Sequence, residues 1–252
     1  QGSGELKQAT TVSMESGATI DASATKNGDG GTVVLWSDVG NTNGYTQMDG
    51  EILATGAGSG MGGKVETSGH VLGVTGTVNA GKGGEWLLDP IDMTITSDGT
   101  YSVDSSGGTA SPTTNGITVL NTSINTALDN GNNVTLTTSG GTGGSGSITV
   151  AADITKSSGA SSSLTLQADG AILVNAGITI TDTSSNNALS LNLQATGPIH
   201  FADNASATHS VNIHGDLYLG GKNGGATYAT GNSTYRDGIY IGNSSLDRKS
   251  VV

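Results

Sequence analysis

Short segments of alternating apolar and polar residues recur along this chain, each followed by a turn of glycine and other small residues. In the C-terminal half, "LTLQADGAI" begins at Leu164, "LNLQATGPI" at Leu191 and "VNIHGDLYL" at Val211. These segments start 27 and 20 residues apart. Offsets of this size are typical of solenoid coils, in which equivalent strands stack on one another. The alternation predicts apolar residues facing inward and Thr or Asn facing outward. We therefore expect Leu166 and Leu193 to occupy equivalent inward positions on different coils.

The N-terminal third repeats a different unit, built around pairs of glycines. The segments are "ATIDASATKNGDGGTVVLWS" from Ala18, "GEILATGAGSGMGGKVETSG" from Gly50 and "GTVNAGKGGEWLLD" from Gly76. Each reads as strand, small-residue turn, Gly-Gly and second strand. Glycine suits the corners of stacked coils because it has no Cβ to collide with the next coil and because it reaches positive φ.

A two-layer sandwich would show the same alternation, but the composition favours a solenoid. Hydrophobic residues make up only 33% of the 252 residues, and 42 residues are glycine. A compact globular domain usually has about 45–50% apolar residues, so this chain predicts a thin core. The sequence thus predicts an all-β parallel β-helix, with on the order of ten coils at about 20–25 residues per coil.

One segment departs from the strand pattern. In "VLNTSINTALDNGNN", which runs from Val119 to Asn133, the apolar Ile124 and Leu128 are four residues apart and predict a short helix. The candidates for its ends are Asn121, Thr122 or Ser123 at the start and Gly131 at the end.

A Ser-, Gly- and Thr-rich stretch around residues 105–115 precedes this helix. Together they predict a loop and short helix insertion over residues 99–133. On this division, residues 1–98 form the N-terminal coils with Gly-Gly repeats. Residues 134–252 form the C-terminal coils and a Tyr-rich end.

Net charge and hydropathy exclude several classes of partner. The formal net charge is −12, from 9 basic and 21 acidic residues. Such a chain is unsuited to nucleic acid or to an anionic membrane surface, which both require Lys and Arg. No apolar run approaches the roughly 18 residues of a membrane helix, so we expect no membrane insertion. The opening "QGSGELKQ" has no signal-peptide pattern, and we interpret the chain as a fragment.

The Gly-Gly region resembles a known family of exported bacterial proteins. The segments that carry the likeness are "GDGGTVVLWSD", "GEILATGAGSGMGGKVETSGH", "GTVNAGKGGEWLLDPIDMTI" and "INTALDNGNNVTLTTSG", within residues 18–140. They resemble the filamentous-haemagglutinin-like and high-molecular-weight adhesins of bacterial two-partner secretion. The resemblance implies a right-handed parallel β-helix, export through an outer-membrane transporter, and a place outside the cell or on its surface. It also implies adhesion or biofilm formation through a host-cell or matrix receptor.

Catalytic, cofactor and metal motifs are weak in this sequence. Polysaccharide-active β-helix enzymes need clustered Asp with nearby Arg or Lys, and the chain has only Arg236 and Arg248 as arginines. We therefore expect no enzyme and no cofactor. His200, His209 and His214 lie close together in the sequence, and His200 and His214 would suit a metal if they stacked on adjacent coils. Exposed imidazoles without a metal are the favoured interpretation.

Tyrosines gather in "LYLGGKNGGATYATGNSTYRDGIY" near the C-terminal end. The candidate ligand-binding residues are Tyr218, Tyr228, Tyr235, Arg236 and Tyr240. Large polar residues also suit the cap of a solenoid, so a cap and a sugar-binding surface are both open. The negative net charge favours a neutral or singly charged glycan.

Five N-x-S/T triplets are candidate glycan acceptors. They begin at Asn121, Asn133, Asn204, Asn232 and Asn243. In a chain so rich in Asn, Ser and Thr, several such triplets arise by chance, so modification is open rather than expected.

Taken together, these patterns favour a segment of a secreted surface adhesin whose rod mediates attachment or biofilm formation, with glycan binding as its recognition mode. A structural fibre that self-associates end to end is the alternative. A polysaccharide-active β-helix enzyme is a weaker one.

Overall fold

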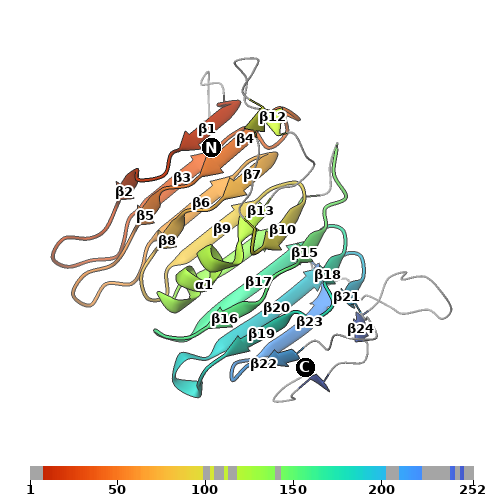
Figure 1. The fold of residues 1–252 in the computed structure, drawn as a ribbon. Helices are drawn as coiled ribbons and strands as arrows, with labels where there is room; N and C mark the ends of the chain where they lie inside the picture. Colours follow the sequence, from red (N-terminus) through yellow and green to blue (C-terminus); the bar gives the residue numbers. More distant parts are fainter. Residues whose placement is uncertain are drawn as a thin grey trace.

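The chain winds into stacked three-sided coils (Figure 1). This computed structural model describes residues 8–98, 103–104, 111–112, 118–139, 143–202, 210–222, 239–241 and 245–246. The strands of successive coils pair in parallel and in register, and the coils follow one another from β1, β2 and β3 at one end to β22 and β23 near the other. The predicted all-β parallel β-helix is confirmed.

One side of the coils is a nine-stranded sheet. Its order is β1-β4-β7-β13-β10-β15-β18-β21-β24. Its strands are β1 Thr11–Met14, β4 Tyr45–Met48, β7 Val71–Val74, β10 Met93–Thr96, β13 Thr118–Leu120, β15 Ile148–Val150, β18 Ile172–Val174, β21 Ile199–Phe201 and β24 Ile239–Ile241.

The second side is a seven-stranded sheet, ordered β3-β6-β9-β14-β17-β20-β23. Its strands are β3 Thr32–Trp36, β6 Lys64–Ser68, β9 Glu85–Asp89, β14 Asn133–Thr137, β17 Ser162–Ala168, β20 Leu189–Ala195 and β23 Leu217–Gly221.

The third side is a column of short elements that contains the helix. Its members are β2 Thr19–Asp21, β5 Glu51–Leu53, β8 Thr77–Asn79, α1 Asn121–Asp129, β16 Ile154–Lys156, β19 Thr179–Asp182, β22 Ser210–Asn212 and β25 Ser245–Leu246. A 3-10 turn, η1 Ser185–Asn187, connects β19 to β20. The helix contacts both β8 and β16, so it occupies the place of one strand in this column.

Inward side chains stack on their equivalents in the neighbouring coils. In the seven-stranded sheet, Leu164 pairs in register with Leu191, and Leu166 with Leu193. All four are fully buried, while Thr165 between the leucines of its strand faces outward. The predicted equivalence of Leu166 and Leu193 is confirmed. The predicted place of the third segment of that series, from Val211, is wrong: Leu191 pairs with Leu217, whereas Val211 pairs with Ile180 in the third column. Each coil needs only a few large apolar side chains, because the coils above and below cover them.

The Gly-Gly corners are required mainly by close approach of the backbone. A Cβ on Gly30 would lie 1.8 Å from Ala54 O, and one on Gly62 would lie 2.2 Å from Ala80 O. Any side chain there would push adjacent coils apart. Among the six glycines of the three pairs, only Gly83 has a positive φ, of 69°. Lack of a Cβ is therefore the main property used at these corners.

The end of the helix matches the sequence expectation, but its start does not. Gly131 has a φ of 78°, and its N–H donates to Leu128 O at 2.9 Å, which is part of a glycine-terminated helix end. The predicted caps Asn121, Thr122 and Ser123 are wrong, because the N-cap is Leu120, which makes no capping side-chain bond. The helix instead begins directly after β13, so strand continuity fixes its first turn.

A buried lysine joins the helix to the strand above it. The Lys156 Nζ donates to Leu128 O at 2.5 Å and to Ser158 O at 2.8 Å. The ammonium group thus meets the negative end of the helix dipole, where a cation is favoured. Burial lowers the pKa of Lys156, and the nearby carboxylates of Asp129 and Asp182 oppose that shift.

The coils are longer than the sequence periodicity indicated. In the part of the chain that the structure describes, the seven strands of the second sheet correspond to seven coils, with β24 and β25 beginning another, rather than to about ten. The repeat is shortest between the register partners Lys64 and Glu85, and it is longest between Glu85 and Asn133.

The longest coil contains a reversal of strand order. After β10, the antiparallel pair of β11 Val103–Asp104 and β12 Ser111–Pro112 precedes β13, which returns to lie between β7 and β10. The nine-stranded sheet therefore receives two strands from this coil.

Opposite substitutions on one strand test the inward and outward assignment. We expect Leu166→Asp to lower the free energy of unfolding by about 4 kcal/mol or more, because it buries an unpaired charge in a thin core. Thr165→Asp, on the outward face, should change it by less than about 0.5 kcal/mol. Chemical denaturation of both variants measures the difference, and equal losses of stability would contradict the register.

Candidate functional site

An exposed tyrosine ring lies on the outer face of the seven-stranded sheet. Tyr218 on β23 is 38% exposed. A Cβ on Gly220 would lie 2.6 Å from Tyr218 Oη, 2.7 Å from Cζ and 2.9 Å from Cε1. The ring therefore lies along its own strand, over Gly220, instead of standing away from the sheet. The absence of a side chain at Gly220 is what allows this position.

Planar amides border this ring on the neighbouring strand. Asn192 of β20 pairs in register with Tyr218, and Gln194 pairs with Gly220. Because the residue that pairs with Gln194 is a glycine, the space beside the Gln194 amide is taken by the Tyr218 ring that lies over Gly220. An aromatic ring flanked by amide groups offers a ligand both apolar contact area and hydrogen bonds.

The amides continue as a ladder across the preceding coils. Gln167 Nε2 donates to Gln194 Oε1 at 3.0 Å, and Asn192 Nδ2 donates to Thr165 Oγ1 at 3.2 Å. We name this outer surface of β14, β17, β20 and β23 the amide strip. Its members are Thr135, Thr137, Thr165, Gln167, Asn192, Gln194, Tyr218 and Gly220. Each rung lies in register with the next, and none of its side chains carries a charge.

Charged residues border the amide strip. Lys222 Nζ forms an ion pair with Asp169 at 2.7 Å and donates to Thr138 O at 2.8 Å, which ties the end of β23 to residues just after β17 and β14, two and three coils earlier. Asp89 ends β9, the strand that pairs with β14 on the N-terminal side of the strip. The uncharged surface is therefore bordered by charged residues at its N-terminal end and along one side.

The surroundings of Asp89 change its titration. Burial raises its pKa to about 6, the negative charge of Glu66 adds to the rise, and Asp169 adds a smaller effect. Lys222 opposes the shift. Ser68, which pairs in register with Asp89, donates from Oγ to Glu66 Oε1 at 3.0 Å. Carboxylates thus crowd this end of the strip and disfavour additional negative charge there.

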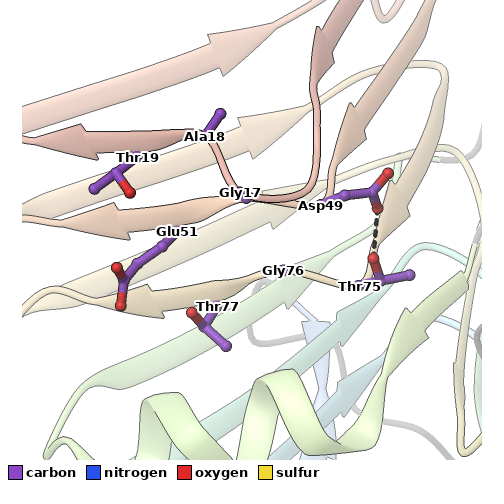
Figure 2. Close-up of a pocket in the computed structure, with 9 residues that line it drawn as sticks. Gly17, Ala18, Thr19, Asp49, Glu51, Thr75, Gly76 and Thr77 are labelled. Atoms are coloured by element: carbon purple, nitrogen blue, oxygen red, sulfur yellow. Dashed lines mark hydrogen bonds between the residues drawn. The ribbon is translucent and has the colours of Figure 1, made fainter.

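An open pocket lies at a different corner, between the first and third sides of the N-terminal coils (Figure 2). It has a volume of about 270 Å³ and is lined by Gly17, Ala18, Thr19, Asp49, Gly50, Glu51, Thr75, Gly76 and Thr77. Thr75 Oγ1 donates to Asp49 Oδ1 at 2.5 Å, and the Gln47 amide donates to the same oxygen. The Asp49 carboxylate is thus already used within the fold.

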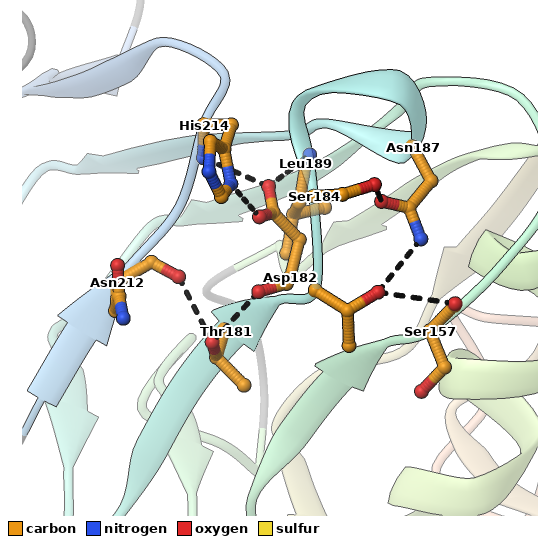
Figure 3. A network of polar contacts seen from close by, with 9 residues as sticks. Ser157, Thr181, Asp182, Ser184, Asn187, Leu189, Asn212 and His214 are labelled. Carbon is orange, nitrogen blue, oxygen red and sulfur yellow. Dashed lines mark hydrogen bonds and ion pairs between the residues drawn. The ribbon is translucent and has the colours of Figure 1, made fainter.

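A buried carboxylate organises the corner after β19 (Figure 3). Asp182 Oδ2 accepts from the backbone N–H groups of Leu189 at 2.7 Å and His214 at 2.8 Å. Asp182 Oδ1 contacts His214 Nδ1. The Asp182 carboxylate takes the place of backbone acceptors at the corners of two neighbouring coils. The contact between Asp182 and His214 therefore has a structural role.

The structure separates the two histidines proposed to stack. His200 lies on β21 in the nine-stranded sheet, whereas His214 follows β22 in the third column, so they stand on different sides of one coil. The stacking that a shared metal would require is therefore absent, because the chain turns a corner between the two histidines. His209 lies outside the described residues. Within the part of the chain that the structure describes, no group of three His, Cys, Asp or Glu could hold a metal ion.

Only part of the predicted tyrosine site can be placed. Tyr218 lies in the amide strip, and the backbone of Tyr240 on β24 pairs with His200 in the nine-stranded sheet. These two tyrosines therefore belong to different sides of the solenoid. Tyr228, Tyr235 and Arg236 lie outside the described residues.

Two of the five candidate glycan acceptors are described. Asn121 begins α1, and its Nδ2 donates to Asp153 O at 2.8 Å. Asn133 on β14 uses its Oδ1 to accept from both the N–H and the hydroxyl of Ser163, at 3.0 Å each. Both amides thus connect neighbouring coils. Asn204, Asn232 and Asn243 lie outside the described residues.

Sequence reasoning found Tyr218 but missed its surroundings. The repeated "LTLQA" and "LNLQA" place Gln167 and Gln194 at equivalent outward positions, and that identity is the signal that could have indicated the ladder. The role of Gly220 carries no comparable signal, because "LGG" reads as one more corner in a glycine-rich chain.

No protein-family model matches the chain, and a search of curated proteins finds none similar to it. Among the described residues, no helix is long and apolar enough to cross a membrane.

Asp89 should make the stability of the protein depend on pH. Its pKa rises from an ordinary 3.8 to about 6 on folding, so the folded state binds the proton more tightly. The resulting penalty is absent below the unfolded pKa, grows as pH rises between the two values, and is complete above about pH 6. We expect Asp89→Asn to raise the free energy of unfolding at pH 7 by about 1–2 kcal/mol, allowing for solvent screening, and to have little effect at pH 4. Denaturation at both pH values measures this, and an equal effect at the two would contradict the raised pKa.

Proposed function

We propose that this chain is a segment of a secreted, surface-associated bacterial adhesin, in which the solenoid is a rod that presents the amide strip to glycans. The observation that carries the proposal is the Tyr218 ring held over Gly220 beside Asn192 and Gln194. Sugar rings have apolar faces that pack on aromatic rings and hydroxyl groups that exchange hydrogen bonds with amides. The arrangement provides both kinds of contact on one surface.

The charge distribution also supports a glycan ligand. The chain as a whole carries −12, yet the amide strip is uncharged. A negative protein that binds nucleic acid or an anionic membrane would need a basic patch. A neutral glycan meets no electrostatic opposition on the strip. In this proposal the rod leaves the cell through an outer-membrane transporter of a two-partner system and mediates attachment or biofilm formation.

A structural fibre that assembles end to end is the second candidate. Successive coils of this fold are joined by parallel, in-register backbone pairing, which is the same contact that would join one solenoid to the end of another. Long filaments under the electron microscope, formed without any glycan, would favour the fibre over the adhesin.

Removal of the tyrosine ring tests the adhesin proposal. We expect Tyr218→Ala to weaken binding on a glycan array, and to cells, by about tenfold, because stacking on an aromatic ring contributes about 1 kcal/mol or more. Tyr218→Phe keeps the ring and should bind nearly as well as the parent.

Val34→Ala is the matched control. Val34 is 46% exposed on β3 of the same sheet, far from the amide strip, so its change should leave binding intact. All three variants should keep the parent Tm. Undiminished binding by Tyr218→Ala with an unchanged Tm would refute the proposal.

A further inference from the structure

We propose that the ligand of the amide strip is a neutral, extended, β-linked polysaccharide that lies along the axis of the solenoid and contacts four successive coils. This inference rests on the proposed function and specifies its ligand. It follows from the repeat, the shape and the charge of the strip.

The repeat of the strip suits a polymer of identical units. Thr135 pairs with Thr165, Thr165 with Asn192, and Asn192 with Tyr218, which gives one column perpendicular to the strands. The spacing between successive strands is about 4.8 Å. An extended β-linked sugar chain advances by a similar distance per residue, so each sugar can lie over one rung and contact the side chains of that rung.

A second column provides the same kind of contact beside the first. Thr137 pairs with Gln167, and Gln167 pairs with Gln194. Hydroxyl and amide groups both donate and accept hydrogen bonds, as sugar hydroxyls do. A ribbon-shaped chain that carries hydroxyls along both edges can therefore bond to both columns at once.

The shape of the site favours a ribbon over a compact sugar. The strip is the surface of a β-sheet, and the Tyr218 ring lies along that surface over Gly220 instead of closing a pocket. A single sugar would contact only one rung and bury little area. Affinity must therefore accumulate over several rungs.

The borders of the strip define the length and charge of the ligand. At the N-terminal end, Asp89 lies at the end of β9, the strand next to the last rung, and Glu66 lies one strand farther out on β6. Asp169 lies at the side in its ion pair with Lys222, and the exposed Asp216 precedes β23. These acids disfavour an anionic polymer, and Asp89 limits the neutral surface on the N-terminal side of the four described rungs.

A chain-length series of cello-oligosaccharides tests this inference by isothermal titration calorimetry. We expect affinity to rise from the disaccharide to the tetrasaccharide and then to level off at the hexasaccharide. Tyr218→Ala should weaken every oligomer. The double change Thr135→Ala and Thr137→Ala, at the rung farthest from Tyr218, should weaken the tetrasaccharide by about fivefold and leave the disaccharide unchanged.

A matched double variant controls for the loss of two threonines. Thr94 and Thr149 pair in register on the outer face of the nine-stranded sheet, so Thr94→Ala with Thr149→Ala should not alter binding. A carboxylated polymer such as oligogalacturonate should bind more weakly than a neutral chain of the same length.

The outcomes separate this inference from the proposed function. If glycan binding depends on Tyr218 but not on chain length or on Thr135 and Thr137, the axial chain is refuted and the adhesin proposal stands. Tighter binding of oligogalacturonate, or of a protein receptor that needs no glycan, would also refute the neutral polysaccharide. If the protein binds neither glycans nor cells, both this inference and the proposed function are refuted.

Discussion

Parallel backbone pairing between coils, in register, is the interaction on which the rest of this structure depends. It places each residue directly above its equivalent, about 4.8 Å away, so that like side chains form columns. Inside, the columns are leucine, isoleucine and valine, as at Leu164 and Leu191. A chain with 33% hydrophobic residues can therefore bury a continuous core, because each apolar side chain is covered by two others. The same pairing brings corners so close that Gly30 and Gly62 tolerate no Cβ.

The sequence predicts the parts of this fold that repeat. Alternation and self-similarity indicated the solenoid, and they correctly placed Leu166 and Leu193 because inward positions are decided by side-chain period alone. Structural features that occur only once in the chain could not be predicted in this way. The return of β13 to lie between β7 and β10 depends on contacts across sequence distance, and so does the burial of Lys156 against the end of α1. The coil count was too high because the repeat between β9 and β14 contains that return and is lengthened by it.

The same distinction between repeated and single features applies to the candidate site. Its ladder of amides could have been derived from the repeated Gln167 and Gln194, because equivalent positions of a solenoid must stack. The position of the Tyr218 ring depends instead on one glycine two residues later on the same strand. Nothing in the sequence distinguishes Gly220 from the corner glycines, since both serve by lacking a side chain. Its effect is nevertheless opposite, because it opens space for a neighbouring ring rather than for another backbone.

The position of Tyr218 also bears on whether the tyrosine-rich end is a cap or a binding surface. A cap residue would cover the apolar interior at the last coil, with its ring buried against inward leucines. Tyr218 instead faces outward, is 38% exposed, and flanks Asn192 on the outer surface. Its coil is also followed by β24 and β25 on the other two sides, so it does not end the solenoid there. An outward aromatic ring does not help to close the core. It is instead accessible to a molecule outside the fold.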